Sequence, residues 1–283
     1  MHDEDLQQLI AEQSLLLRDH TGSEARILPE HAALALRDAH DTDLGDLFRT
    51  ALAQDILPER YLRNRTSISI AEQLRLARAS VAVIGAGGLG GQVILCLTRL
   101  GIGRLRVVDP EVFEASNLNR QALSTVDSLG QNKADVARDT AAAINPAVRV
   151  TPYQARLTPD NAASILEGVD VVVDGLDSIQ DRFTLEEAAK ALSIPMVHAA
   201  IDGFVVQVMT IFPDDPGLQL LYGQGRTTPA SPLGNPVFAP HLAATLQAME
   251  VLKIVLTRGK PARKGMISAD LESGDFSHFS FGS

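Results

Sequence analysis

The 283-residue chain is 45% hydrophobic and carries a formal net charge of −10, a composition typical of a globular protein with a sizeable apolar core. The acidic balance disfavours a broad nucleic-acid-binding surface, because negative charge repels phosphate backbones, so we expect no nucleic-acid partner. The single cysteine, Cys96, excludes an internal disulfide and any multi-cysteine zinc site.

The first residues, MHDEDLQQLI, are acidic and lack the basic and apolar regions of a signal peptide. No stretch approaches the roughly 18 apolar residues that a membrane-spanning helix needs. We therefore expect a cytoplasmic, soluble protein without a membrane partner.

Residues 1–58 are rich in Leu, Ala, Asp, Glu and Arg, and their apolar residues recur at helical spacing. The clearest examples are LQQLIAEQSLLL and DLGDLFRTALAQDIL. This pattern predicts a helical N-terminal extension, a dimer arm or docking surface, that precedes a second domain over residues 59–283.

Residues 80–202 alternate between short apolar runs and longer segments with strong helix formers. The predicted strands are SVAVIG, RLRVVD, AVRVTPY, VDVVVDGL and IPMVHAA, and the helices between them include LGGQVILCLTRLG, GQNKADVARDTAAAIN, TPDNAASILEG and RFTLEEAAKAL. Strands that alternate with helices in this way predict an α/β fold, a Rossmann-like, doubly wound and mostly parallel sheet.

The pattern changes after Asp202, where FVVQVMTIF, GMISADLE and FSHFSF read as strands without crossover helices. They predict additional antiparallel C-terminal strands beside the parallel set, with the helix AATLQAMEVLKIVLTRG between the first and the second. The Pro- and Gly-rich stretch before that helix is too long for a simple turn, and long loops of this kind are often functional.

A glycine loop, GAGGLG, stands between the first of these strands and its helix. Gly85, Gly87 and Gly90 have the G-x-G-x-x-G spacing, which places the unpaired N–H groups of a helix N-terminus against phosphate oxygens. Asp109 ends the next strand, where a carboxylate can accept hydrogen bonds from ribose hydroxyls. A nucleotide site is predicted, but the glycines do not distinguish a dinucleotide from ATP.

Polar residues further along the chain favour ATP, whose triphosphate needs more positive charge around it than a dinucleotide does. Asn117 and Arg120 stand three positions apart, so both can face one site, and Lys133 begins the helix that follows. Asp177 follows a strand at the carboxyl edge of the predicted sheet, where it can hold Mg²⁺ together with phosphate oxygens.

At this point the chain resembles the ThiF/MoeB/HesA family, relatives of the ubiquitin-activating enzymes. The matching segments run in family order over residues 60–281, and they are RYLRN, VAVIGAGGLGG, VVDPEVFEASNLNRQ, GQNKADVA, INPAV, DGLDS and LQAMEVLKIVLTRGKPARKG. The S-N-L-N-R-Q string is the most specific of them. The family adenylates the C-terminal glycine carboxylate of a small ubiquitin-like protein with ATP and magnesium.

The resemblance implies roles for individual residues. The backbone of Gly85, Gly87, Gly88 and Gly90 would lie against the nucleotide phosphates, and Asp109 would bind ribose. The residues implied to contact the phosphates and stabilise developing negative charge are Asn117, Arg120 and Lys133.

Asp177 is implied to be the magnesium ligand near the attacked α-phosphate. Arg63 matches an arginine that reaches into the neighbouring subunit's ATP site, which implies a homodimer, whereas Gln121 and Arg182 match supporting positions. Asp177 could instead cap the helix that follows it, a role that needs a different orientation of the carboxylate.

The chain departs from the family in its cysteines. Many members hold a structural zinc with two Cys-x-x-Cys pairs, which are absent here, so no zinc is expected. Several members also use a cysteine in the loop before the last long helix. That loop here contains Thr227, Thr228 and Ser231 but no thiol, so sulfur transfer by this polypeptide alone is not expected.

The function that these observations favour is adenylation of a ubiquitin-like sulfur-carrier protein of the ThiS or MoaD type with a C-terminal Gly-Gly, for thiamine or molybdopterin-type cofactor synthesis. The alternatives are adenylation of another carboxylate, such as a peptide C-terminus or threonylcarbamoyl-tRNA, and a catalytically silent scaffold. A nicotinamide oxidoreductase depends on the glycine loop alone. We expect Cys96 to be a buried core thiol and His198 to be structural.

Overall fold

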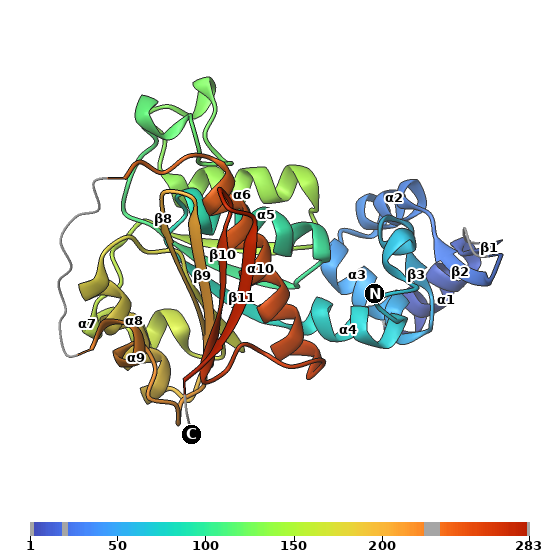
Figure 1. The fold of residues 1–283 in the computed structure, drawn as a ribbon. Helices are drawn as coiled ribbons and strands as arrows, with labels where there is room; N and C mark the ends of the chain where they lie inside the picture. The colour runs from blue at the N-terminus through green and yellow to red at the C-terminus, as the bar shows by residue number, and fades with distance from the viewer. Residues whose placement is uncertain (1–2, 19–21, 224–232, 282–283) are drawn as a thin grey trace.

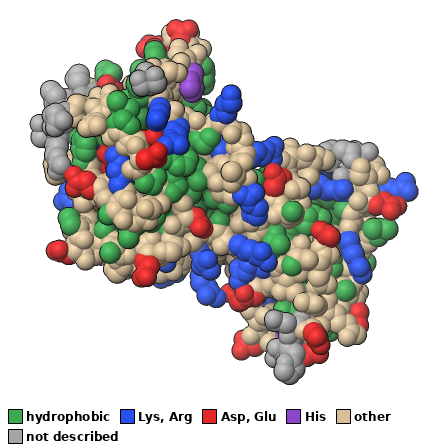
Figure 2. Space-filling model, turned by 90° about the horizontal axis from the view of Figure 1, so that it is seen from below, with side chains coloured by type: hydrophobic (Ala, Val, Ile, Leu, Met, Phe, Trp, Pro, Cys, Tyr) green, Lys and Arg blue, Asp and Glu red, His purple; other side chains and the backbone are tan. Residues whose placement is uncertain are grey.

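The computed structural model describes residues 3–18, 22–223 and 233–281 and has two lobes joined at a narrow waist (Figures 1 and 2). The larger lobe is an α/β unit with an eight-stranded sheet, and the smaller one is formed by the N-terminal residues. Among the described residues, no helix is both long and apolar enough to span a bilayer.

The large sheet has the order β11-β10-β9-β8-β7-β4-β5-β6. The five strands from β8 to β6 in that order are parallel, and β9, β10 and β11 extend the sheet with antiparallel pairing, as predicted. The strands are β4 (Ser80–Ile84), β5 (Arg104–Val108), β6 (Arg149–Tyr153), β7 (Val171–Asp174), β8 (Met196–Asp202), β9 (Val205–Ile211), β10 (Gly265–Asp270) and β11 (Asp275–Ser280).

Helices cover both faces of this sheet because successive strand side chains point to opposite sides. Val81 and Val83 of β4 pack on one face, whereas Ala82 and Ile84 pack on the other. The first face is covered by α5 (Gly88–Leu100), α6 (Lys133–Ile144) and α10 (Phe238–Leu256), and the second by α7 (Pro159–Leu166) and α8 (Ile179–Ala191), with the short helix α9 (Gln219–Tyr222) nearby. Buried on both faces, the parallel strands are almost continuously apolar.

The N-terminal lobe contains the predicted helices and, in addition, a three-stranded sheet that the sequence did not predict. Its elements are α1 (Asp3–Gln13), β1 (Leu15–Arg18), β2 (Glu24–Leu28), α2 (Glu30–His40), α3 (Leu44–Ala53) and β3 (Leu57–Pro58). Ile10, Ile27, Leu47 and Phe48 are among the buried residues of a separate apolar core. This core is distinct from the two that cover the large sheet, and Tyr61, Ala77 and Ala147 of the rest of the chain also belong to it.

The segment Leu15–Leu17 corrects the helix expected over LQQLIAEQSLLL. The helix ends at Gln13, and the three leucines form most of strand β1, which pairs with β2. Consecutive leucines do not follow the helical period, and all residues of β1 are exposed. The hydrogen bonds to β2 decide the conformation here, and they are invisible to a local pattern.

Polar contacts join the two lobes at the waist, a region of the surface where Figure 2 shows Lys and Arg side chains gathered. Arg60, in the short 3₁₀ helix η1 (Glu59–Asn64), binds Glu30 of the small lobe and Asn145 of the large one. Arg149 forms an exposed ion pair with Asp43. Helix α4 (Ile70–Arg78) then leads into β4.

Candidate nucleotide-binding site

A cavity of about 440 Å³ opens at the carboxyl ends of β4, β5 and β7. The chain runs outward from β4 through β5 to β6 and then returns to the opposite side of β4 as β7. Such a reversal point is where open α/β sheets bind ligands. The predicted site residues that line the cavity are Gly85, Gly87, Gly88, Asp109, Asn117, Arg120, Gln121, Lys133 and Asp177.

The glycine loop is shaped by two close backbone contacts. A Cβ at Gly90 would lie 1.7 Å from the carbonyl oxygen of Gly85, so only glycine fits there. Gly85 has a φ of +93°, and a Cβ on it would lie 2.6 Å from the carbonyl oxygen of Gly175. Gly90 does not line the cavity itself. It lets α5 begin close enough to β4 for the loop to present its backbone.

Helix α5 directs an uncapped N-terminus into this cavity. Its N-cap residue is Gly87, so no side chain occupies the first N–H groups, which together with the helix dipole favour an anion. A Cβ at Gly87 would meet only the Gln121 side chain, at 3.7 Å or more. The protein therefore does not require glycine at position 87 for its own packing, whereas a closely approaching phosphate would.

Asp109 stabilises the glycine loop by accepting a hydrogen bond from its backbone. Its carboxylate accepts hydrogen bonds from the backbone N–H groups of Ala86, at 2.7 Å, and Glu111, at 2.8 Å. Burial raises the pKa of Asp109, and these two hydrogen bonds oppose that rise. A carboxylate has about four acceptor positions, so the predicted contact with ribose remains compatible with this geometry.

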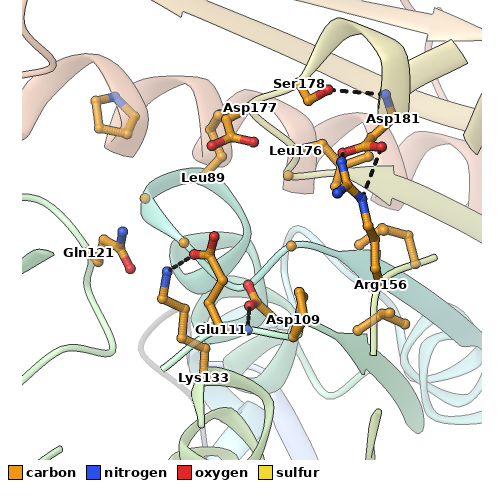
Figure 3. Close-up of a pocket in the computed structure, with 18 of the residues that line it drawn as sticks. Leu89, Asp109, Glu111, Gln121, Lys133, Arg156, Leu176, Asp177, Ser178 and Asp181 are labelled. Atoms are coloured by element: carbon orange, nitrogen blue, oxygen red, sulfur yellow. Dashed lines mark hydrogen bonds and ion pairs between the residues drawn. The ribbon is translucent and has the colours of Figure 1, made fainter. Parts of the chain in front are cut away.

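Lys133 has a partner that the sequence did not reveal. Its Nζ lies 2.7 Å from a carboxylate oxygen of Glu111, and its side chain is only 5% exposed, whereas that of Glu111 is 66% exposed (Figure 3). Asn132 caps α6 by accepting N–H groups of its first turn, which holds Lys133 at the cavity wall. The only signal in the sequence was the place of Glu111 just after the end of β5, at the carboxyl edge of the sheet.

Arg120 and Gln121 form the adjoining wall. The Nη1 atom of Arg120 donates to the Ser116 carbonyl and to Asn119 Oδ1, each at 2.9 Å. Asn117 is buried, accepts the Glu114 N–H at 3.0 Å and holds the turn through which Arg120 and Gln121 enter the cavity. Gln121 Oε1 is buried and has no hydrogen-bond partner among the described residues, so an acceptor faces the site.

Asp177 points into the cavity and is not the helix cap (Figure 3). Ser178 caps α8 by accepting the Asp181 N–H at 3.3 Å, which resolves the alternative left open by the sequence. No hydrogen bond with another described residue engages the Asp177 carboxylate. The described residues contain no cluster of three or more potential metal ligands, so a cation here would depend on Asp177 and on phosphate oxygens.

The opposite side of the cavity carries residues that the sequence did not single out. The guanidinium of Arg156 binds the carboxylate of Asp181, and both lie at this side with Leu176 (Figure 3). Ile84, Val108 and Leu157 add apolar surface. Arg156 and Asp181 come from segments 25 residues apart, so only the tertiary structure pairs them.

The two remaining predicted residues, Arg182 and Arg63, differ in whether they line the cavity. Arg182 lines the cavity and donates to the carbonyl of Leu176, at 2.7 Å from Nη2. Arg63 is exposed in η1, does not line the cavity and makes no hydrogen bond or ion pair with the described residues. Its role at the ATP site of a neighbouring subunit stays a prediction. Thr227, Thr228 and Ser231 lie outside the described residues.

Cys96 and His198 are both away from the reactive part of the cavity. Cys96 lies on α5, partly buried against the apolar core, and burial raises the pKa of its thiol. His198 is fully buried on β8, and its Nδ1 atom lies 2.6 Å from Asp174 Oδ2, a partner that the sequence did not reveal.

Comparison with known families shows to which family this chain belongs. The model of the ThiF family matches residues 61–282, nearly the whole large lobe. The chain belongs to the ThiF family. Among its relatives, a sulfur carrier protein adenylyltransferase from Thermus thermophilus is 37% identical over 220 residues, covering 72% of this chain and 79% of the relative. A SAMP-activating enzyme E1 from Haloferax volcanii is 36% identical over 192 residues, covering 66% and 71%.

Solved structures share the fold of this ThiF-family chain. PaaA superimposes with a TM-score of 0.67 at 20% identity and covers 95% of this chain and 99% of its own. Escherichia coli MccB in complex with ATP gives 0.67 at 19% identity, covering 88% and 82%. Coverage of 95% means that the alignment with PaaA extends into the N-terminal lobe.

Proposed function

We propose that the chain is an adenylyltransferase that uses ATP to activate the C-terminal glycine carboxylate of a ubiquitin-like sulfur-carrier protein. The observation that carries the proposal is the convergence of Arg120, Lys133 and Asp177 on the uncapped N-terminus of α5 in one cavity. Relatives with at least 36% identity bear the names of enzymes that act on such carriers.

The residues suit the chemical problem of joining two anions. A carboxylate is ionised at neutral pH and needs no general base, so the protein contributes positioning and charge neutralisation. Arg120 and Lys133 bring two cationic groups to the cavity wall, and Lys133 would leave Glu111 when a phosphate competes for its ammonium group. The carboxylate attacks the α-phosphorus, the bond to the leaving pyrophosphate breaks, and an acyl-adenylate forms.

A magnesium ion fits the residues present. Asp177 offers one carboxylate, and Mg²⁺ is commonly held by one or two carboxylates together with substrate phosphates. When bound, the ion would neutralise phosphate charge near the attacked phosphorus. The buried, unpartnered Oε1 of Gln121 supports a polar occupant in this part of the cavity.

A homodimer is part of the proposal because Arg63 is exposed in η1 and does not line the cavity of its own chain. Residues 1–58 are proposed to be a domain distinct from residues 59–283, because most of the apolar core around which they fold comes from their own residues, with Tyr61, Ala77 and Ala147 added from the rest of the chain. Sulfur transfer is assigned to another protein, since the loop before α10 has no cysteine. Whether the pathway leads to thiamine or to a molybdopterin-type cofactor, and the cytoplasmic location, stay predictions.

The test is ATP–pyrophosphate exchange by the full chain with Mg²⁺ and candidate carrier proteins that end in Gly-Gly. We expect carrier-dependent exchange that falls by about 10²- to 10³-fold in Arg120→Ala, the usual effect of removing one preorganised stabilising group, and by a similar factor in Asp177→Ala. Arg138→Ala is the matched control, because Arg138 lies on α6 beyond Lys133, is 44% exposed and does not line the cavity.

The outcomes separate the alternatives. Exchange that depends on a peptide or a threonylcarbamoyl-tRNA, and not on any carrier, would move the substrate to another carboxylate. Tight ATP binding without exchange would make the chain a scaffold. Binding of a nicotinamide dinucleotide in preference to ATP would contradict the assignment of Arg120 and Lys133 to a triphosphate.

A further inference from the structure

A buried polar network lies directly behind the loop that carries Asp177. It connects Asp174 at the end of β7, His198 on β8, Arg182 on α8 and Tyr222 on α9. Asp174 and His198 are fully buried. Asp174 contacts His198 and Arg182, and Tyr222 contacts both of these residues, so side chains from four elements form one cluster. Such burial is costly unless every polar group is paired.

The network holds both polar backbone groups of Leu176, the residue before Asp177. The Leu176 N–H donates to Asp174 Oδ1 at 2.9 Å, and the Leu176 carbonyl accepts from Arg182 Nε and Nη2 at 3.2 and 2.7 Å. The Gly175 N–H donates to the Ile84 carbonyl at 2.8 Å. The chain is consequently fixed at each residue between β7 and Asp177.

Arg182 can only donate, which sets the direction of its own hydrogen bonds, and the carboxylate of Asp174 accepts from its neighbours. The Nη1 atom of Arg182 donates to the Tyr222 hydroxyl oxygen at 2.8 Å, and the Tyr222 O–H is placed to donate to His198 Nε2, 3.4 Å away. With Nε2 as an acceptor, His198 is neutral and carries its proton on Nδ1, which donates to Asp174 Oδ2 at 2.6 Å. Burial, which lowers the pKa of His198 against the opposing effect of Asp174, agrees with a neutral ring.

We propose that His198 is a positioning residue: by donating to Asp174 it orients the carboxylate that holds Leu176, and so sets the place of Asp177 in the cavity. Neither His198 nor Tyr222 lines the cavity, so the effect passes through Asp174 and Arg182. The proposal deepens the proposed function, on which it rests for the magnesium-binding role of Asp177. Outer partners of this kind commonly change metal affinity or activity by roughly 10- to 100-fold when they are removed.

Three variants and one control test this role. His198→Leu removes both hydrogen bonds, whereas His198→Asn keeps an N–H near the position of Nδ1. Tyr222→Phe removes only the hydroxyl from a half-buried ring. Tyr61→Phe is the control, since Tyr61 is a buried tyrosine whose hydroxyl accepts from Asn145 at 3.0 Å, far from Asp177 in the small-lobe core.

The first measurement is amide hydrogen exchange of the full chain without nucleotide, which needs no activity. We expect the segment 174–178 to exchange faster in His198→Leu and Tyr222→Phe, and to keep its protection in His198→Asn and Tyr61→Phe. The second is the Mg²⁺ concentration for half-maximal ATP–pyrophosphate exchange, which should rise by roughly 10- to 100-fold in His198→Leu while the KM for the carrier stays unchanged.

Unchanged protection of segment 174–178 and an unchanged Mg²⁺ requirement in a folded His198→Leu protein would overturn the proposal. An equal loss of protection and an equal rise of the Mg²⁺ requirement in His198→Asn and His198→Leu would also overturn it, because the N–H donated to Asp174 would then be irrelevant. If His198→Leu does not fold, Tyr222→Phe decides by the same two measurements. Absence of exchange activity in the wild-type protein would refute the proposed function and leave the amide-exchange comparison valid.

Discussion

Replacing Gly90 by alanine tests whether one backbone contact shapes the nucleotide loop. A Cβ at Gly90 would lie 1.7 Å from the Gly85 carbonyl oxygen, whereas ordinary van der Waals contact begins at 3.4 Å, so the two segments would have to separate by 3.4 − 1.7 = 1.7 Å. Both contacting groups are held by backbone, and no change of side-chain rotamer can relieve the clash. The first turn of α5 would move away from β4.

This displacement should lower both the thermal stability of the protein and its affinity for ATP. Forcing an extra methyl group into a packed site usually destabilises a protein by about 1–3 kcal/mol, and each kcal/mol lowers the Tm of a domain of this size by about 2–4 °C. We therefore expect a Tm lower by roughly 2–12 °C. Loss of one hydrogen bond to a charged phosphate, worth about 1.5–3 kcal/mol, would weaken ATP binding about tenfold or more.

Gly91→Ala is the matched control on the same helical turn. A Cβ there would lie 3.3 Å from the Ala86 carbonyl oxygen and from Leu123 Cγ, so its neighbours need to move by only about a tenth of an ångström. Thermal unfolding and titration with ATP would be measured for both variants. Equal Tm and equal Kd for Gly90→Ala and Gly91→Ala would refute the steric explanation of the loop.

Two further predictions concern the contacts around the waist. Arg60→Ala should lower the free energy of unfolding by about 1–3 kcal/mol in denaturant titrations, because it removes a largely buried donor from Asn145 and Glu30. Arg149→Ala breaks an exposed ion pair and should lower the free energy of unfolding by at most about 1 kcal/mol. Equal losses in the two variants would contradict this interpretation. At the start of α4, hydrogen bonds from Ser69 lower the pKa of Glu72, so its stabilising effect is present above the ordinary glutamate pKa of about 4.3 and is lost as pH falls through the lower folded value. The Tm advantage of wild type over Glu72→Gln should thus be largest near neutral pH and vanish in acid, and an advantage independent of pH would refute this assignment.

The N-terminal lobe shows where local patterns stop being informative. Helix α3 was predictable, because its apolar residues recur with the helical period and Asp43 caps it. The strand Leu15–Arg18 was not, because its conformation depends on pairing with β2. Propensity for strands is largely a matter of such neighbours, which a local window does not contain.

The candidate site also contains contacts that the sequence did not predict. Glu111 was not predicted as the partner of Lys133, because 22 positions separate them. Only the fold of the long segment between β5 and α6 brings their charges together. Likewise, Asp174 and His198 belong to neighbouring strands whose adjacency is a property of the sheet order.

The sequence by itself determined the α/β alternation, the glycine loop and the set of polar residues that line the cavity, because these depend on periodicity and on residues close together along the chain. Only the tertiary structure decided how charges pair, which carboxylate caps no helix and which buried groups hold the loop before Asp177. The physical reason is that electrostatic and hydrogen-bond energies depend on distance in space, and long-range strand order sets that distance.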